Sequence, residues 1–225
     1  MSKTDSSDTS RSSLRMQVYD RIRMEMDKGH FSPGSFIRLN ALSKQMGISK
    51  TPLREAMIRL ETEGFVTIYP RQGVVVNRFD LDDSRYLFGV IGSLESDMVT
   101  ANFDRFDASV TAGMRAYCLT MREALDEDDF TAYDHTHWKY HQVFTDLADN
   151  IFVNRIIAPI KHRLWDCPKR GFSKKWLAMA CDEHEGIVDA IEAGDLEQAV
   201  FLIRERHWSY TYNESYIRKV YFPNP

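Results

Sequence analysis

Hydrophobic residues near the start of the chain recur with the period of an amphipathic helix. Val18, Ile22 and Met26 are each four residues apart, so they share one face of a helix over residues 14–28. The preceding residues 1–13 are polar and rich in serine. They show no such period, and we expect them to form a disordered tail.

A second helical segment follows a turn. Gly29 favours the end of the first helix, and Ser32-Pro33-Gly34 predicts the turn. A short helix is then expected over about Leu39–Met46. Gly47 suits a left-handed C-terminal cap, and Ser49 can serve as the N-cap of the next helix.

The helix that begins at Ser49 has one apolar face. Pro52 falls in its first turn, where the missing N–H costs little. Gly64 favours its end. The positions expected to face inward are Leu53, Met57 and Leu60.

A β-hairpin is predicted directly after this helix. Phe65–Tyr69 and Val74–Val76 are β-prone, and Pro70–Gly73 supplies the turn between them. A turn, a short helix, a capped second helix and a hairpin in this order form a winged helix-turn-helix. Residues 14–77 therefore predict a domain that binds double-stranded DNA.

The rest of the chain is predicted to be almost wholly helical. A short linker at residues 78–80 leads to an all-helical domain over residues 81–218, and residues 219–225 form a tail. The expected helices cover residues 82–102, 106–126, 130–148, 151–165, 174–193 and 195–218. The predicted fold is therefore mainly α, with a winged N-terminal domain and a C-terminal helical bundle.

The charge is distributed unevenly between these two parts. Residues 1–79 contain 13 Lys/Arg and 8 Asp/Glu, a net charge of +5, while residues 80–225 contain 16 and 25, a net charge of −9. A basic first third fits attachment to a polyanion such as DNA, although an ordinary solvated surface would look similar.

Other features of the chain fit a cytoplasmic protein. No apolar run is long enough to span a membrane, and the N-terminus has no apolar core typical of a secretory signal. Cys118, Cys167 and Cys181 are widely spaced and odd in number. They are expected to be free thiols in a reducing compartment.

The start of the second winged-domain helix carries the candidate DNA contacts. Hydroxyl groups, an ammonium group and free helix N–H groups at this end suit phosphate, and Arg54 can reach phosphate or guanine. Arg71 at the hairpin turn can enter the minor groove. The candidate residues are Ser49, Lys50, Thr51, Arg54, Arg71, Gln72 and Gly73. The alternative is that Ser49 only caps the helix and that Arg54 pairs with Glu55.

The first domain resembles the winged-helix domain of the GntR family of bacterial transcription regulators. The resemblance covers about residues 14–77. The matching segments are Pro33-Gly34, Leu42-Ser43, Met46–Ala56, Arg59–Glu61, Glu63–Val66 and Gly73. Lys50 stands where Arg is usual in the family, and Leu39 where an acidic residue is common. The resemblance implies a homodimer that reads a short palindromic operator.

Several histidines of the second domain could hold a metal ion. His137 and His141 are four residues apart on one expected helix, so their rings project from the same face. His184 and His207 lie on two later helices. Neutral imidazoles that converge from different helices suit a divalent ion. The alternative is that these histidines belong to the surface or to a hydrogen-bonded core.

The second domain resembles the all-helical ligand-binding domain of the FadR-type subfamily over about residues 80–212. This resemblance implies a divalent metal (Zn, Ni or Mn) held by an Asp and three His beneath a site for a small carboxylate. His141 and His184 match family ligands, and His137 stands where the family has Asp. The last family His aligns nearest Arg206, and one residue corresponds to ~100° on a helix. His207 therefore reaches the site only through a register shift or a bulge.

An effector site is also expected in this domain. If Arg206 replaces a metal ligand, its guanidinium could grip an anionic effector without a metal. The candidate effector-binding residues are Arg206, Asn150 and Tyr140.

The sequence thus predicts a transcription regulator and not an enzyme. We expect a repressor that releases operator DNA when a small organic acid or related metabolite binds, with Asn77–Asp80 as the movable joint. The first alternative is a metal-dependent hydrolase that uses His137, His141 and His184, with Asp134 or Glu183 as the base. The second is a structural DNA-binding protein without an effector.

Overall fold

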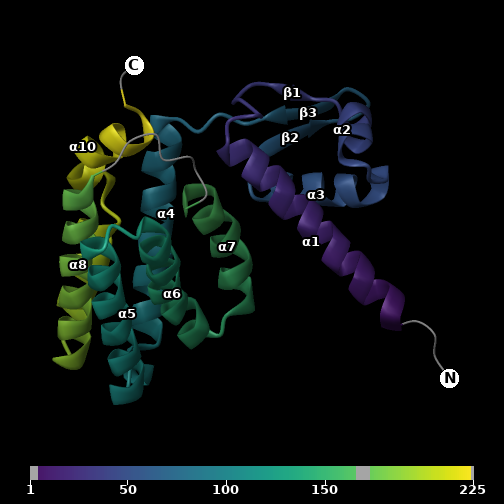
Figure 1. Ribbon diagram of the computed structural model, residues 1–225. Helices are drawn as coiled ribbons and strands as arrows, with labels where there is room; N and C mark the ends of the chain where they lie inside the picture. The colour runs from purple at the N-terminus through teal and green to yellow at the C-terminus, as the bar shows by residue number, and fades with distance from the viewer. Residues whose placement is uncertain (1–4, 166–172, 224–225) are drawn as a thin grey trace. The chain divides into compact units, whose positions relative to one another are not determined.

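The computed structural model describes residues 5–165 and 173–223, and it divides into two compact units. The boundary between them falls after Phe79, and the short piece of chain that begins at Pro159 groups with the first unit. The first unit holds all the strands of the described residues, and the second is helical (Figure 1).

The first unit contains three helices and a small sheet. Its elements are α1 (Asp5–Asp27), β1 (Phe36–Ile37), α2 (Leu39–Met46), α3 (Lys50–Thr62), β2 (Val66–Tyr69) and β3 (Gly73–Val76). The strands are antiparallel in the order β1-β3-β2. This arrangement confirms the mainly α fold class with a small β element, and it adds β1 to the expected hairpin.

Glycines end the two helices that precede the hairpin, as the sequence predicts. Gly47 caps α2 with φ 66°, and its N–H donates to the carbonyl of Lys44. Gly64 follows α3 with φ 78°. Both φ values lie in the left-handed region, which residues with a Cβ adopt only at a cost.

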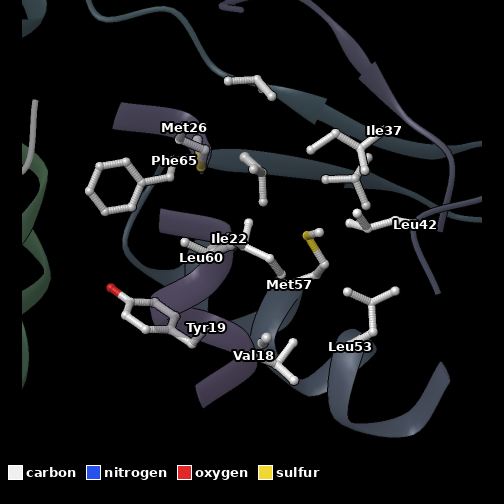
Figure 2. Packing of buried hydrophobic residues seen from close by; sticks show 14 residues of the cluster. Val18, Tyr19, Ile22, Met26, Ile37, Leu42, Leu53, Met57, Leu60 and Phe65 are labelled. Atoms are coloured by element: carbon white, nitrogen blue, oxygen red, sulfur yellow. The ribbon is translucent and has the colours of Figure 1, made fainter. Parts of the chain in front are cut away.

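The apolar faces of α1 and α3 form one core with the sheet. Figure 2 shows Ile22 of α1 beside Leu60 and Met57 of α3, with Ile37 of β1 across the same cluster. Leu53, Met57 and Leu60 are each fully buried, as expected for the inward face of α3. This packing fixes α3 in rotation, so its opposite face must point to solvent.

The second unit is a helical bundle. Its elements are α4 (Leu81–Ala101), η1 (Phe103–Arg105), α5 (Ala108–Asp126), α6 (Phe130–Ala148), the part of α7 (Ile151–Trp165) before Pro159, α8 (Lys174–Glu192), α9 (Leu196–Phe201), η2 (Leu202–His207) and α10 (Tyr210–Tyr221). The interior is filled by large side chains such as Met114, Met121 and Phe144. None of the helices in these described ranges is long and apolar enough to cross a membrane.

The expected single helix over residues 195–218 is divided into three parts. A π-helical segment, η2, follows α9, and Trp208 and Ser209 separate it from α10. Ser209 caps α10 by accepting a hydrogen bond from the N–H of Tyr212. Apolar periodicity does not reveal this change from α to π winding, because a single π-helical turn is too short to alter the period read over a window of about 11–18 residues.

Two helix ends also differ from the expected boundaries. α1 begins at Asp5, within the expected tail of residues 1–13, because a polar segment can continue a helix without an apolar period. α10 continues to Tyr221, past residue 218, because Val220 and Tyr221 are buried. The remaining parts of these tails, residues 1–4 and 224–225, lie outside the described residues.

Two of the three cysteines are described, and both are free and buried. Burial raises the pKa of the Cys118 thiol to about 12 and that of Cys181 to about 11. Both thiols are therefore protonated and unreactive at neutral pH. Cys167 lies outside the described residues.

Leu60→Ala tests the packing of α3 directly. Leu60 is fully buried, so truncation should lower the free energy of unfolding of the first unit by ~2–5 kcal/mol. Ile58→Ala on the exposed face of the same helix is the control and should change it by about 0.5 kcal/mol or less. Urea denaturation followed by circular dichroism measures both. If both variants lower the free energy of unfolding equally, α3 does not pack against the core through Leu60 as described.

Candidate functional site

The N-terminal end of α3 presents polar and basic side chains to solvent. Ser49 is the N-cap residue, yet its hydroxyl makes no capping hydrogen bond. The side chains of Lys50, Thr51 and Arg54 are exposed. Arg54 forms no hydrogen bond or ion pair with another described residue, so the structure does not contain the alternative pairing with Glu55. This end of α3 combines free helix N–H groups with positive charge, which suits phosphate and base edges.

The turn between β2 and β3 carries the other candidate contacts. Arg71 is exposed and adopts φ 64°, and the N–H of the exposed Gln72 donates to the carbonyl of Tyr69. Gly73 has φ 146°, and a Cβ there would lie 2.5 Å from the ring of Phe36. The turn therefore requires glycine at residue 73 and holds Arg71 in a conformation that is uncommon for a side-chain-bearing residue.

Four histidines of the second unit converge on one point. His137 and His141 lie on α6, His184 lies on α8, and His207 is the last residue of η2. One ligand atom from each ring lies within 4.8 Å of all the others. The Nε2 atom of His141 is 3.1 Å from those of His137 and His207, and 3.2 Å from that of His184. Two nitrogens bound to one ion at ~2.0–2.1 Å lie roughly 3 Å apart, so these spacings fit a shared metal ion.

Two buried carboxylates set the orientation of two of these rings. His141 Nδ1 lies 2.9 Å from Glu95 Oε2, and His207 Nδ1 lies 2.9 Å from Glu183 Oε2. A carboxylate accepts the hydrogen bond, so each Nδ1 carries a proton, and in the neutral ring the Nε2 atom is then the one that can bind a metal. The Nε2 atoms of His141 and His207 lie 3.1 Å apart, a separation that either a hydrogen bond or a shared metal ion can occupy. The four converging imidazoles could therefore hold a metal ion.

The environment of His184 keeps its ring neutral. Burial, followed by the other histidines of the cluster, lowers the pKa of His184 well below its usual value. Its Nδ1 atom is buried without a hydrogen-bond partner among the described residues. Neutral imidazole is the form that binds a metal, so burial prepares this ligand.

The π-helical segment brings His207 into the cluster. Between α9 and Trp208, the wider winding of η2 absorbs the one-residue offset that regular α-helical geometry would leave at His207. His207 is buried, whereas Arg206 is exposed with its guanidinium over the ring of Tyr212. The structure therefore contains the bulge that the sequence reasoning required for His207, and it places Arg206 outside the cluster.

The other candidate effector residues have structural contacts of their own. Tyr140 is fully buried and donates its hydroxyl hydrogen to the carbonyl of His184. Asn150 is exposed and accepts hydrogen bonds from the N–H groups of Phe152 and Val153 at the start of α7. Roles for Arg206, Tyr140 and Asn150 in effector binding stay predictions.

Sequence reasoning missed the residues that support the cluster. Trp208 donates from Nε1 to the same Glu95 oxygen that holds His141. A Cβ at Gly92 would lie 2.7 Å from Trp208, so a glycine on α4 gives the indole room to approach. Glu95 is separated from His141 by 46 residues, and no local pattern marks such a pair. Glu183, expected as a base in the hydrolase alternative, instead orients His207.

Comparison with known families and proteins agrees with this architecture. The sequence model of the family "Bacterial regulatory proteins, gntR family" matches residues 14–76, and that of the "FCD domain" family matches residues 87–207. The second match alone covers more than half of the chain. The chain therefore belongs to the GntR family and carries the FadR-type C-terminal domain. It is a DNA-binding transcription regulator and not an enzyme.

Individual relatives of the chain are also transcription regulators. The probable D-xylose utilization operon transcriptional repressor of Paenarthrobacter nicotinovorans is 25% identical over 84% of this chain and 83% of its own. The HTH-type transcriptional repressor GlaR of Escherichia coli is 23% identical, over 83% and 89% respectively. The solved structure of E. coli McbR/YncC has a TM-score of 0.70 at 17% identity, covering 90% of this chain and 98% of that one. That last likeness supports the fold alone.

His141→Ala tests the cluster as a metal site. Metal-stripped wild-type protein should gain thermal stability when Zn²⁺ is added, by ~2.7 kcal/mol at a hundredfold excess over Kd. His141→Ala should lose this gain, because its Nε2 is the atom shared by all three short contacts. His135→Ala, which removes an exposed histidine from the same helix, should keep it. A wild type that Zn²⁺ does not stabilise would contradict the assignment.

Proposed function

We propose that this regulator is a repressor that binds operator DNA as a homodimer in the cytoplasm. The carrying observation is the exposed N-terminal end of α3, where Lys50 and Arg54 make no ion pair among the described residues. The residues proposed to contact DNA are Ser49, Lys50, Thr51, Arg54, Arg71, Gln72 and Gly73. Two of the relatives named above are repressors, one of them a probable repressor, which supports this direction of regulation.

We propose that a divalent metal ion at the four histidines forms part of the effector site. The ion would supply a positive charge and a coordination position for a small carboxylate, and the imidazoles would hold it in place. The protein residues that support this proposal are the four histidines with Glu95 and Glu183 behind them. Zinc, nickel and manganese are the candidates from the sequence.

We propose that the short segment between the two units is the joint that moves when an effector binds. The N–H of Asn77 donates to the carbonyl of Phe65, its side-chain amide donates to the carbonyl of Gly64, and its Oδ1 accepts from Thr67. Asp80 begins α4 with a reciprocal capping box with Asp83. Asn77 is thus held by the first unit and Asp80 by α4. The proposed joint is therefore shorter than the expected Asn77–Asp80 and consists of Arg78 and Phe79.

The helix α4 supports a connection from the cluster to this joint. Asp80 caps its N-terminus, and Glu95 further along the same helix holds His141. A change in ligand at the cluster could therefore shift a helix that begins at the joint. In this proposal, the effector biases the placement of the two winged domains of a dimer, so that they no longer fit successive major grooves.

Arg54→Ala tests the DNA-binding surface. The loss of its guanidinium should weaken operator binding by ~1–3 kcal/mol for each protomer, without changing the folded stability. Arg21→Ala removes the same charge from an exposed position on α1 and should have a much smaller effect. Fluorescence anisotropy with a promoter fragment at fixed salt measures both. Equal losses for the two variants would point to general electrostatic attraction without a specific reading surface.

A panel of small carboxylates tests the proposed response. With metal-loaded protein, at least one carboxylate should lower operator affinity by about fivefold or more, the usual scale of coupling between two sites. His141→Ala should still bind the operator but ignore that carboxylate. A carboxylate that acts equally on both proteins would place the effector site elsewhere.

A further inference from the structure

All four ligands of the cluster are imidazoles, and this sets the kind of metal ion that it accepts. In the described part of the chain, the converging group contains His137, His141, His184 and His207, with neither a carboxylate nor a thiolate among its ligand atoms. The aspartate expected by resemblance at residue 137 is replaced by a half-buried histidine. The first coordination shell is therefore neutral and offers nitrogen alone from the protein.

The negative charge near the cluster is carried by carboxylates that do not reach its centre. Glu95 and Glu183 accept hydrogen bonds from Nδ1 of His141 and His207, so each lies across an imidazole ring from the converging Nε2 atoms. These carboxylates raise the basicity of the ligand nitrogens and offset the charge of a bound ion. They supply no oxygen ligand.

Trp208 helps to hold the Glu95 carboxylate away from the centre of the cluster. Its indole N–H donates to the Glu95 oxygen that already accepts from His141, at 2.7 Å. Its ring also packs near those of His141 and His207, with centroids 5.1 and 4.9 Å away. Glu95 is thus held on the outer side of His141.

We propose that the cluster takes a borderline divalent ion, Zn²⁺, Ni²⁺ or Cu²⁺, and discriminates against Mn²⁺ and Mg²⁺. Imidazole nitrogen suits the first group, whereas manganese and magnesium favour carboxylate, carbonyl and water oxygens. The histidine at residue 137 is the residue that sets this preference. The inference rests on the proposed metal occupancy. Of the ions that the sequence left open, it keeps zinc and nickel and removes manganese, and it adds copper.

The test compares metal affinities of the full chain after its metal has been stripped. Ni²⁺ and Mn²⁺ are titrated separately against a chromophoric chelator, with wild type, His137→Asp and His135→Asp. Any nitrogen-rich site favours Ni²⁺ to some degree, so the decisive quantity is the change in the Ni²⁺/Mn²⁺ affinity ratio. His135→Asp adds the same charge to the same helix at an exposed position and serves as the control.

His137→Asp should lower the Ni²⁺/Mn²⁺ ratio by about tenfold or more, mainly by strengthening Mn²⁺ binding, while His135→Asp leaves it near the wild-type value. An unchanged ratio in His137→Asp would overturn the proposal, as would wild-type protein that binds Mn²⁺ as tightly as Ni²⁺. If His137→Asp does not fold, His137→Asn supplies a neutral oxygen ligand and should lower the ratio in the same direction.

The same titrations distinguish a protein that binds no metal from one that binds metal without the proposed preference. Wild-type protein that binds neither ion would overturn both the metal occupancy and the preference inferred from it. Operator binding through α3, measured in the same preparation, would still report on the repressor proposal. A ratio that fails to change in a protein that binds Ni²⁺ tightly would overturn the preference alone.

Discussion

The hydrogen bonds from His141 to Glu95 and from His207 to Glu183 are the contacts on which the site in the helical unit depends. Each bond fixes a proton on Nδ1 and turns an Nε2 lone pair toward the same point. The Nε2 atoms of His141 and His207 lie 3.1 Å apart, which suits two ligands of one ion. Four helical segments, α4, α6, α8 and η2, must therefore be correctly packed to bring the carboxylates and imidazoles together. The same packing links the chemistry of the cluster to the arrangement of the bundle.

Local sequence signals were sufficient for most of the winged unit. Gly47 and Gly64 end their helices with positive φ, and Pro52 lies in the first turn of α3, as their residue types predict. The two-residue strand β1 was not predictable, because it is too short to show an alternating pattern and is stabilised by pairing with the distant β3. The fold of this unit thus follows from short-range preferences, with one strand added by tertiary pairing.

The sequence predicts the histidine ligands of the candidate metal site, but it does not predict the residues that orient them. The spacing of His137 and His141 placed two rings on one helix face, and the resemblance suggested the partners. The π-helical segment η2 is followed by Trp208, which contacts Gly92 and Glu95 of α4, and no window of sequence around His207 contains these partners. Glu95 and Glu183 could not be assigned as orienting groups because each acts on a histidine brought near by folding. Long-range hydrogen bonding, and not residue spacing, decides which nitrogen of each ring would face a bound ion.

The metal content of the intact protein tests this account most directly. Protein purified without chelators or a polyhistidine tag should contain about one divalent ion per chain by elemental analysis, because four converging imidazoles bind an ion as the protein folds. Replacing both His141 and His207 with alanine should remove that ion while the winged unit still binds DNA. Folded wild-type protein that contains no metal and takes up none when zinc or nickel is supplied would contradict the account.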